Sequence, residues 1–504
     1  MRLNKLSPLL TVHAIIVAAF CLIFLAGAVL LTVEPDEVWN LMSTMKAFGL
    51  PQPPTSALDA PVTTTGGLHA LLHGLVALVH SGDILLHRLV SVVAALCLLA
   101  LVYRTLRRHV GNSALAAAGT AVFVTAPGFL LQASLATSEI IATMVFLLAA
   151  LYWVGPGHRS AVGALAAGVL FGLACATRMT CLSMLPALLL WAVFAGRGWP
   201  VRLAHALLAV ATAGSVFAAC VAGYVVAFAD VPWHDAVAAA GSASGVARGY
   251  DGVLLRLNYA VVGEGVMPVL ALLALTGWIC SRLVAQREGD ATLQLCSFLL
   301  FAGLSGWLAW LVKAPISHVR YLWPAIPLLW LAGLLLAASA LARAERPRVL
   351  WIAHAVVVAS CAVQGLLNVR MLAVGESLML VYEAARRTPL SRPGSYGVPR
   401  ANQEAMARHL AELPSTANVT AFLPQAAYPL TYLGGRTVGR WQVTQGASAD
   451  DYQLVQPTDP IWVGDWDRIG WVKTHMTLEQ AYGDYALYRG RGVRTPGARS
   501  PGVD

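Results

Sequence analysis

Residues 9–40 read LLTVHAIIVAAFCLIFLAGAVLLTVEPDEVWN, an uncharged apolar run followed at once by a cluster of carboxylates. The run from Leu9 to Thr32 is long enough to cross about 30 Å of hydrocarbon as a helix, because roughly 20 apolar residues suffice. It is too long for the apolar core of a secretory signal peptide, and no clean small-residue cleavage site follows it. We therefore predict a retained first membrane span.

Similar apolar runs recur along the first three quarters of the chain. Of the 504 residues, 58% are hydrophobic and only 12% are charged, whereas about 25% are charged in an ordinary soluble domain. Backbone polar groups in lipid must be paired within the segment, so each run is predicted to be helical. We expect an α-helical polytopic membrane protein with about 11 transmembrane helices within residues 1–370. The predicted spans are 9–32, 83–103, 113–130, 138–154, 161–176, 180–196, 203–228, 265–281, 292–312, 321–341 and 350–368. The shorter apolar segment 66–80 is predicted to be a re-entrant or interfacial helix.

The basic residues of the loops predict the orientation. Thirteen Lys and Arg residues lie in loops on the side of the N-terminus, and seven lie on the opposite side before residue 321. The positive-inside rule then places the N-terminus in the cytoplasm, and an odd number of spans places the C-terminal residues outside it. We attribute the net charge of +9 to this topology and not to nucleic acid binding. The expected location is a bacterial inner membrane.

From residue 371 the composition becomes that of a soluble protein. Segment 401–412 is predicted to be an amphipathic helix, and residues 418–423 a strand. A short helix at 425–432 and short strands at 461–464 and 485–488 continue the alternation. We therefore predict a small α/β domain at 371–490, periplasmic or extracellular, followed by a disordered tail at 491–504.

The first candidate site follows the first span. Glu34, Asp36 and Glu37 lie at the membrane boundary, where ionisable groups are costly and usually functional. Carboxylates held close together raise the pKa of one of them, which suits a general base. The structural alternative is that Asp36 caps a helix running to Phe48, with Glu37 at its positive end. The two interpretations are compatible, and these residues alone leave both open.

Other charged residues are predicted to face the same outer surface. Glu139 opens the fourth span, either as a favourable charge at a helix N-terminus or as a second carboxylate of the site. The candidate ligands of a lipid phosphate are Arg88, Arg178, Lys313, Arg320 and Tyr321. Arginine offers a planar donor fork that fits phosphate, whereas the alternative role for these residues is interfacial anchoring.

Metal binding is the weaker interpretation of the histidines. His69 and His73 lie four residues apart on the short apolar segment, a spacing that can bind zinc. The Glu of the HExxH motif is absent, so we expect polar interfacial histidines and no metal site among them. No cofactor is predicted with certainty, and a divalent metal stays an open alternative.

Taken together, these motifs resemble those of the GT-C glycosyltransferases, especially protein O-mannosyltransferases and the lipid A aminoarabinose transferase. The resemblance spans most of residues 1–370. Asp36-Glu37 is similar to the family's Asp-Glu after the first span, and Glu139 to an acidic residue before the fourth span. The other matching segments are Gly82–Leu89, Gly172–Arg178 and Arg320–Pro324, which is similar to an Arg-Tyr-x-x-Pro motif.

The resemblance implies inverting transfer of a sugar from a polyprenyl-phosphate donor on the extracytoplasmic side of the membrane. The first outer loop, 33–82, is then expected to be catalytic, with Asp36 as the base, helped by Glu37 or Glu139. Arg320 and Tyr321 are expected at the donor phosphate, together with Arg178, Lys313 and Arg88. The acceptor can be a lipid, a glycan or a protein. Two alternatives are a multi-spanning secondary transporter and a non-catalytic envelope assembly protein. The sequence shows neither related halves nor mid-span acids, which disfavours a transporter.

Overall fold

The structure is a computed structural model, and it describes a defined part of the chain. The described residues are 7–31, 33, 35–50, 67–80, 83–126, 128–194, 198–228, 290–313, 323–344, 347–374, 400–422, 428–434, 436, 438–440, 448–456, 466–483 and 485–491. The chain separates into two compact units. The first contains residues 1–29 and 62–371, and the second contains residues 30–61 and 372–504. The beginning of the predicted outer loop therefore belongs to the same unit as the C-terminal residues.

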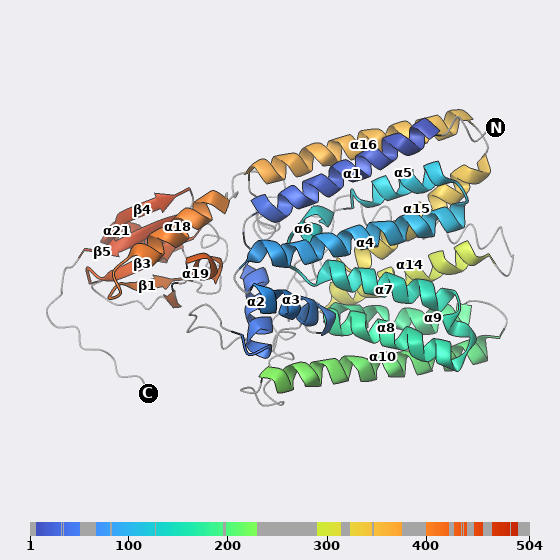
Figure 1. The fold of residues 1–504 in the computed structure, drawn as a ribbon, viewed down its shortest axis with the longest axis horizontal. Coiled ribbons are helices and arrows are strands. Elements are labelled where there is room, and N and C mark those ends of the chain that lie inside the picture. The colour runs from blue at the N-terminus through green and yellow to red at the C-terminus, as the bar shows by residue number, and fades with distance from the viewer. Residues whose placement is uncertain are drawn as a thin grey trace. The chain divides into compact units, whose positions relative to one another are not determined.

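The first unit is helical (Figure 1). Its helices are α1 (Ser7–Leu30), α3 (Gly67–Val79), α4 (Ile84–Val110), α5 (Ser113–Phe123), α6 (Phe129–Ser134), α7 (Glu139–Val154), α8 (Ala161–Thr177), α9 (Pro186–Phe194), α10 (Trp199–Phe228), α14 (Ala291–Lys313), α15 (Ala325–Ala344) and α16 (Pro347–Val374). Two 3-10 turns, η2 (Gly157–Arg159) and η3 (Met179–Met184), precede α8 and α9.

The helices agree with most of the predicted spans where both are described. Among the described helices, six are long and apolar enough to cross a membrane: α1, α4, α10, α14, α15 and α16. Four further predicted spans coincide with shorter apolar helices, and the predicted short helix 66–80 is α3. The predicted span 265–281 lies outside the described residues. A helix of 16 residues, such as α7, is only about 24 Å long, which is less than the hydrocarbon thickness.

Two predicted spans are less regular than expected. The run 113–130 is divided into α5 and α6, and Gly128 precedes α6 with a positive φ of 71°. The run 180–196 begins as the 3-10 turn η3, and a regular helix starts only at Pro186. Proline lacks the N–H that would extend a preceding helix, so it favours a helix start.

The surfaces of the outer helices are apolar. On α16 the side chains of Ile352 and Leu366 are 64% and 71% exposed, and on α1 that of Leu22 is 67% exposed. These exposed apolar side chains lie on α1 and α16, which are both long and apolar enough to cross a membrane. The chain is therefore an integral membrane protein, with these faces turned to lipid.

Small residues allow close packing inside the first unit. A Cβ atom on Gly168 would lie 2.7 Å from the carbonyl oxygen of Ala209, and one on Gly172 would lie 2.8 Å from that of Ala213. Glycines four residues apart thus bring the backbone of α8 directly against that of α10, as in many membrane helix pairs. This contact fixes the direction of α8, whose C-terminal end carries Arg178.

The second unit contains α2 (Pro35–Ala47) and a small α/β assembly. Its C-terminal elements are α18 (Arg400–Glu412), β1 (Asn418–Ala421), α19 (Tyr428–Gly434), β2 (Gly439–Arg440), β3 (Asp451–Val455), α21 (Trp466–His475), β4 (Met476–Tyr482) and β5 (Tyr485–Gly490). The strand order is β2-β1-β3-β5-β4. Strand β1 pairs in parallel with β2 and β3, whereas β5 is antiparallel to β3 and β4.

Alternate residues of the strands face two separate cores. Leu454 and Leu487 pack with α18 and α19, while Val455 and Tyr488 pack on the side of α21. The period of two in a strand produces this division. The predicted helix 401–412 and the predicted strands 418–423 and 485–488 are confirmed within a few residues, and the helix predicted at 425–432 begins at Tyr428. Strands β2, β3 and β4 and helix α21 were not predicted, and segment 461–464 lies outside the described residues.

Candidate active site

The acidic cluster after the first span opens helix α2. Pro35 is the first helical residue, and Asp36 and Glu37 follow in the first turn. Asp36 is therefore inside the helix and is not its N-cap, and the helix ends at Ala47, one residue before the predicted Phe48. Carboxylates in a first turn are stabilised in their charged form by the helix dipole. Glu37 is fully buried, and the side chain of Asp36 lies outside the description.

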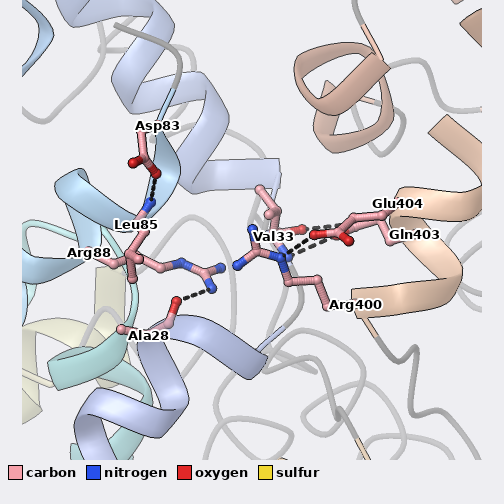
Figure 2. Close-up of polar contacts among 8 residues, drawn as sticks. All are labelled: Ala28, Val33, Asp83, Leu85, Arg88, Arg400, Gln403 and Glu404. Atoms are coloured by element: carbon pink, nitrogen blue, oxygen red, sulfur yellow. Dashed lines mark hydrogen bonds and ion pairs between the residues drawn. The ribbon is translucent and has the colours of Figure 1, made fainter. Parts of the chain in front are cut away.

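A polar contact within the second unit holds the residue that leads into α2. The backbone N–H of Val33 donates to Oε1 of Gln403 at 3.0 Å, and Nε2 of Gln403 donates to the carbonyl oxygen of Val33 at 3.0 Å (Figure 2). One turn of α18 beside this contact is braced by an ion pair of 2.8 Å between Arg400 and Glu404. Gln403 was not a candidate from sequence patterns, because it lies 370 residues from Val33.

Two of the predicted site residues meet in the first unit. Nη2 of Arg178 lies 2.9 Å from Oε1 of Glu139, and their side chains are only 7% and 4% exposed. Glu139 is the first residue of α7, and Arg178 directly follows the last residue of α8. Within the first turns of α7, Thr143 donates to the carbonyl oxygen of Glu139 at 2.7 Å. The pair therefore joins two helix ends in a region of low exposure.

Helix α3 begins against the same end of α8. The N–H of Leu68 donates to Oγ1 of Thr177 at 3.3 Å. Gly67 has a φ of 58°, and a Cβ there would lie 2.9 Å from the backbone of Ala176, so a larger residue does not fit. In the same first turn of α3, the fully buried His69 lies near the backbone of Ala136 and within electrostatic range of Arg178.

Buried polar side chains continue from α3 onto α4. Nδ1 of His73 lies 3.1 Å from Nδ1 of His87, and the rings of His69 and His73 have centroids 4.2 Å apart. Next to His87, the buried Arg88 donates through Nη1 to the carbonyl oxygen of Ala28 at 3.1 Å (Figure 2). Both histidines of α3 were expected at an interface, and they are instead fully buried. Among the described residues, no group of three or more metal-ligating side chains has the geometry of a metal site.

The start of α4 is capped by a side chain. Asp83 accepts a hydrogen bond of 2.8 Å from the N–H of Leu85 (Figure 2). An Asp at an N-cap satisfies one of the unpaired N–H groups of the first turn. The cap sets the first turn of α4, on which His87 and Arg88 lie.

The side chains of three other predicted ligands of a donor phosphate lie outside the part of the chain that the structure describes. Arg320 and Tyr321 lie outside the described residues. Lys313 is the last residue of α14, and its side chain is outside the description. Among the predicted site residues whose side chains are described, the structure brings together Glu139 and Arg178. His87 had not been singled out from the sequence, since a lone histidine in an apolar run carries no motif.

Comparisons with known proteins agree with this architecture. Residues 67–222, which contain α3 to α9 and most of α10, match the family model described as dolichyl-phosphate-mannose-protein mannosyltransferase. A comparison with curated proteins finds no match. The crystal structure of ArnT from Cupriavidus metallidurans bound to undecaprenyl phosphate is similar, with a TM-score of 0.55 and 14% identity over 97% of this chain and 99% of that chain.

Two more solved structures share the fold. The apo state of the same Cupriavidus metallidurans ArnT has a TM-score of 0.55 and 14% identity over 94% of this chain and 97% of that one. The apo form of the Archaeoglobus fulgidus oligosaccharyltransferase has a TM-score of 0.50 and 12% identity over 91% of this chain and 71% of that one. The resemblance noted in the sequence is thus confirmed: the chain is an integral membrane protein with the fold of the GT-C glycosyltransferases, and residues 67–222 match their mannosyltransferase family model.

Proposed function

We propose that this protein is an inverting glycosyltransferase that moves a sugar from a polyprenyl-phosphate donor to an acceptor hydroxyl on the extracytoplasmic side of the membrane. The observation that carries the proposal is the position of Asp36 and Glu37, in the first turn of a helix that begins directly after α1. A general base must be ionised to accept a proton, and a helix N-terminus favours the ionised form of a carboxylate.

The chemistry follows from this arrangement. The Asp36 carboxylate takes the proton of the acceptor hydroxyl while the oxygen of that hydroxyl attacks the anomeric carbon of the sugar. The bond between that carbon and the phosphate oxygen breaks, and the polyprenyl phosphate leaves with the electron pair. Attack from the face opposite the phosphate inverts the anomeric configuration. Glu37 or Glu139 is the helper of the base in this scheme.

The leaving phosphate gains negative charge, so it needs cationic donors. Arg320 and Tyr321 are assigned to it, with Arg178, Lys313 and Arg88 as further candidates. Arg178 is held by Glu139 at 2.9 Å, so its guanidinium is fixed in orientation before any donor binds. A lipid-linked donor is supported by the related fold of ArnT, which has been solved with undecaprenyl phosphate.

The test is a transfer assay with the purified protein in lipid. Labelled polyprenyl-phosphate sugars and an envelope extract are supplied, and label is followed from the donor into any acceptor. The proposal expects label in a new covalent product with the inverted linkage. Label carried across the bilayer on an unchanged donor would identify a transporter, and binding of envelope proteins without transfer of any donor would identify an assembly protein.

A further inference from the structure

The side-chain amide of Gln403 forms two hydrogen bonds, both to the backbone of Val33. Its Oε1 accepts from the N–H of Val33 and its Nε2 donates to the carbonyl oxygen of Val33, both at 3.0 Å. Gln403 and Val33 are each 1% exposed. Two buried hydrogen bonds to one residue fix both its position and its rotation, because a shift or turn of the backbone would leave buried polar groups unpaired (Figure 2).

A second attachment lies further along the same segment. Helix α19 packs against α18, which carries Gln403, and also against α2. The segment is therefore held just before α2 by Gln403 and along α2 by α19. Val38 and Leu41 of α2 are 0% and 1% exposed, so this helix is well buried. Its first turn contains Asp36 and Glu37.

We propose that Gln403 is a positioning residue for the catalytic base, and that the C-terminal α/β elements hold the catalytic segment in register. This inference rests on the proposed function, in which Asp36 accepts the proton. Only two residues separate Val33 from Asp36, so a movement of Val33 is transmitted to the first turn of α2. Displacement of a reacting group by about 1 Å can reduce a rate roughly 100-fold.

The C-terminal unit offers a matched control for this contact. Gln453 is also 1% exposed, accepts from Oγ1 of Thr420 at 2.7 Å, and donates to the carbonyl oxygen of Leu454 at 3.1 Å. Both of its partners lie in the sheet. Gln403→Met and Gln453→Met each remove a buried amide at nearly constant volume, but only the first releases Val33.

The experiment measures kcat, the KM for the donor, and hydrogen exchange of the amides of residues 33–47 in the full-length protein in lipid. We expect Gln403→Met to lower kcat roughly 10- to 100-fold with little change in KM, and to speed exchange in this segment. Gln453→Met should keep both near wild type. Gln403→Glu retains an acceptor for the N–H of Val33 but no donor for its carbonyl, so an intermediate kcat is expected.

Combining Gln403→Met with a variant of the base distinguishes a positioning role from a general loss of stability. In an Asp36→Asn background, Gln403→Met should reduce the residual rate no further, because there is no base left to position. Equal losses of kcat in Gln403→Met and Gln453→Met, or no loss in Gln403→Met, would overturn the inference. If Gln403→Met does not fold, Gln403→Glu decides by the same criteria.

Failure of this inference can be told apart from failure of the proposed function. A wild-type protein that transfers no sugar would contradict the proposed function, while hydrogen exchange would still show whether Gln403 holds residues 33–47. Loss of transfer in Asp36→Asn together with normal kcat and normal exchange in Gln403→Met would overturn only the role of Gln403.

Discussion

Arg178 and Glu139 form an ion pair of 2.9 Å that joins the end of α8 to the first residue of α7. Both side chains are almost completely buried. Two charges taken out of water are tolerated only when they are well paired, and loss of one partner leaves the other uncompensated. The pair is therefore expected to support the structure of this region as well as to orient the guanidinium.

The first prediction concerns this ion pair. Arg178→Met should lower stability by about 3–5 kcal/mol, because it leaves Glu139 buried without its partner. The double variant Arg178→Met with Glu139→Gln should regain part of this loss, since no lone charge remains. Thermal unfolding of the purified protein in lipid measures both effects.

Transfer activity then separates the structural role of the pair from its proposed chemical role. A double variant that is stable but inactive would support a direct part in donor binding. Recovery of full activity together with stability would contradict the assignment of Arg178 to the donor phosphate.

The second prediction concerns the contact between α8 and α10. In Gly172→Ala the new Cβ would lie 2.6 Å from Cβ of Val216 and 2.8 Å from the carbonyl oxygen of Ala213, so the helices must separate. A loss of about 1–3 kcal/mol is expected from this overpacking. Gly214→Ala, on α10, meets nothing within 4 Å and should not destabilise the protein. Equal melting temperatures for the two variants would refute the close contact.

Helices were the part of the fold that the sequence predicted best. An apolar run of sufficient length in lipid has few alternatives to a helix, so the long spans and the short helix α3 could be located in advance. The division of 113–130 into α5 and α6 was missed, because hydropathy does not report a local change of backbone direction. Strand β4 was missed because most of its residues are exposed and it lacks the regular apolar alternation of a typical strand. Strand β3 is buried over four of its five residues but is only five residues long, too short for a clear pattern.

Individual residues of the candidate site could be predicted from the sequence, but the contacts between them could not. The positions of Asp36, Glu139 and Arg178 at the ends of spans identified them as candidates. The pairing of Glu139 with Arg178, and of His73 with His87, depends on how helices pack. The hydrogen bonds of Gln403 to Val33 depend on chain segments 370 residues apart, for which one sequence carries no signal.

The third prediction concerns Arg436, which links the end of α18 to the loop before β1. Its guanidinium donates to the carbonyl oxygens of Leu410, Leu413, Pro414 and Ala417 at 3.4, 2.9, 3.0 and 2.7 Å. Hydrogen bonds from a charged group contribute about 1.5–3 kcal/mol, so Arg436→Met should destabilise the C-terminal α/β elements by an amount of this order. Limited proteolysis of the full chain measures it.

A control for this effect lies on the same helix. Arg408 is exposed on α18, and Arg408→Met should leave the proteolysis rate near that of wild type. Cleavage of Arg436→Met no faster than cleavage of Arg408→Met would show that the four carbonyl contacts do not stabilise these elements.

The most direct test of the account is sugar transfer by Asp36→Asn beside wild type and Asp83→Asn, all in lipid with the same labelled polyprenyl-phosphate sugar. Asn at position 83 can still cap α4, where Asp83 accepts from the N–H of Leu85, so this variant controls for loss of a carboxylate at another helix start. Removal of a general base is expected to lower kcat roughly 100- to 10,000-fold. We predict this loss in Asp36→Asn and near wild-type kcat in Asp83→Asn; equal turnover by wild type and Asp36→Asn would contradict the role of Asp36 as the base.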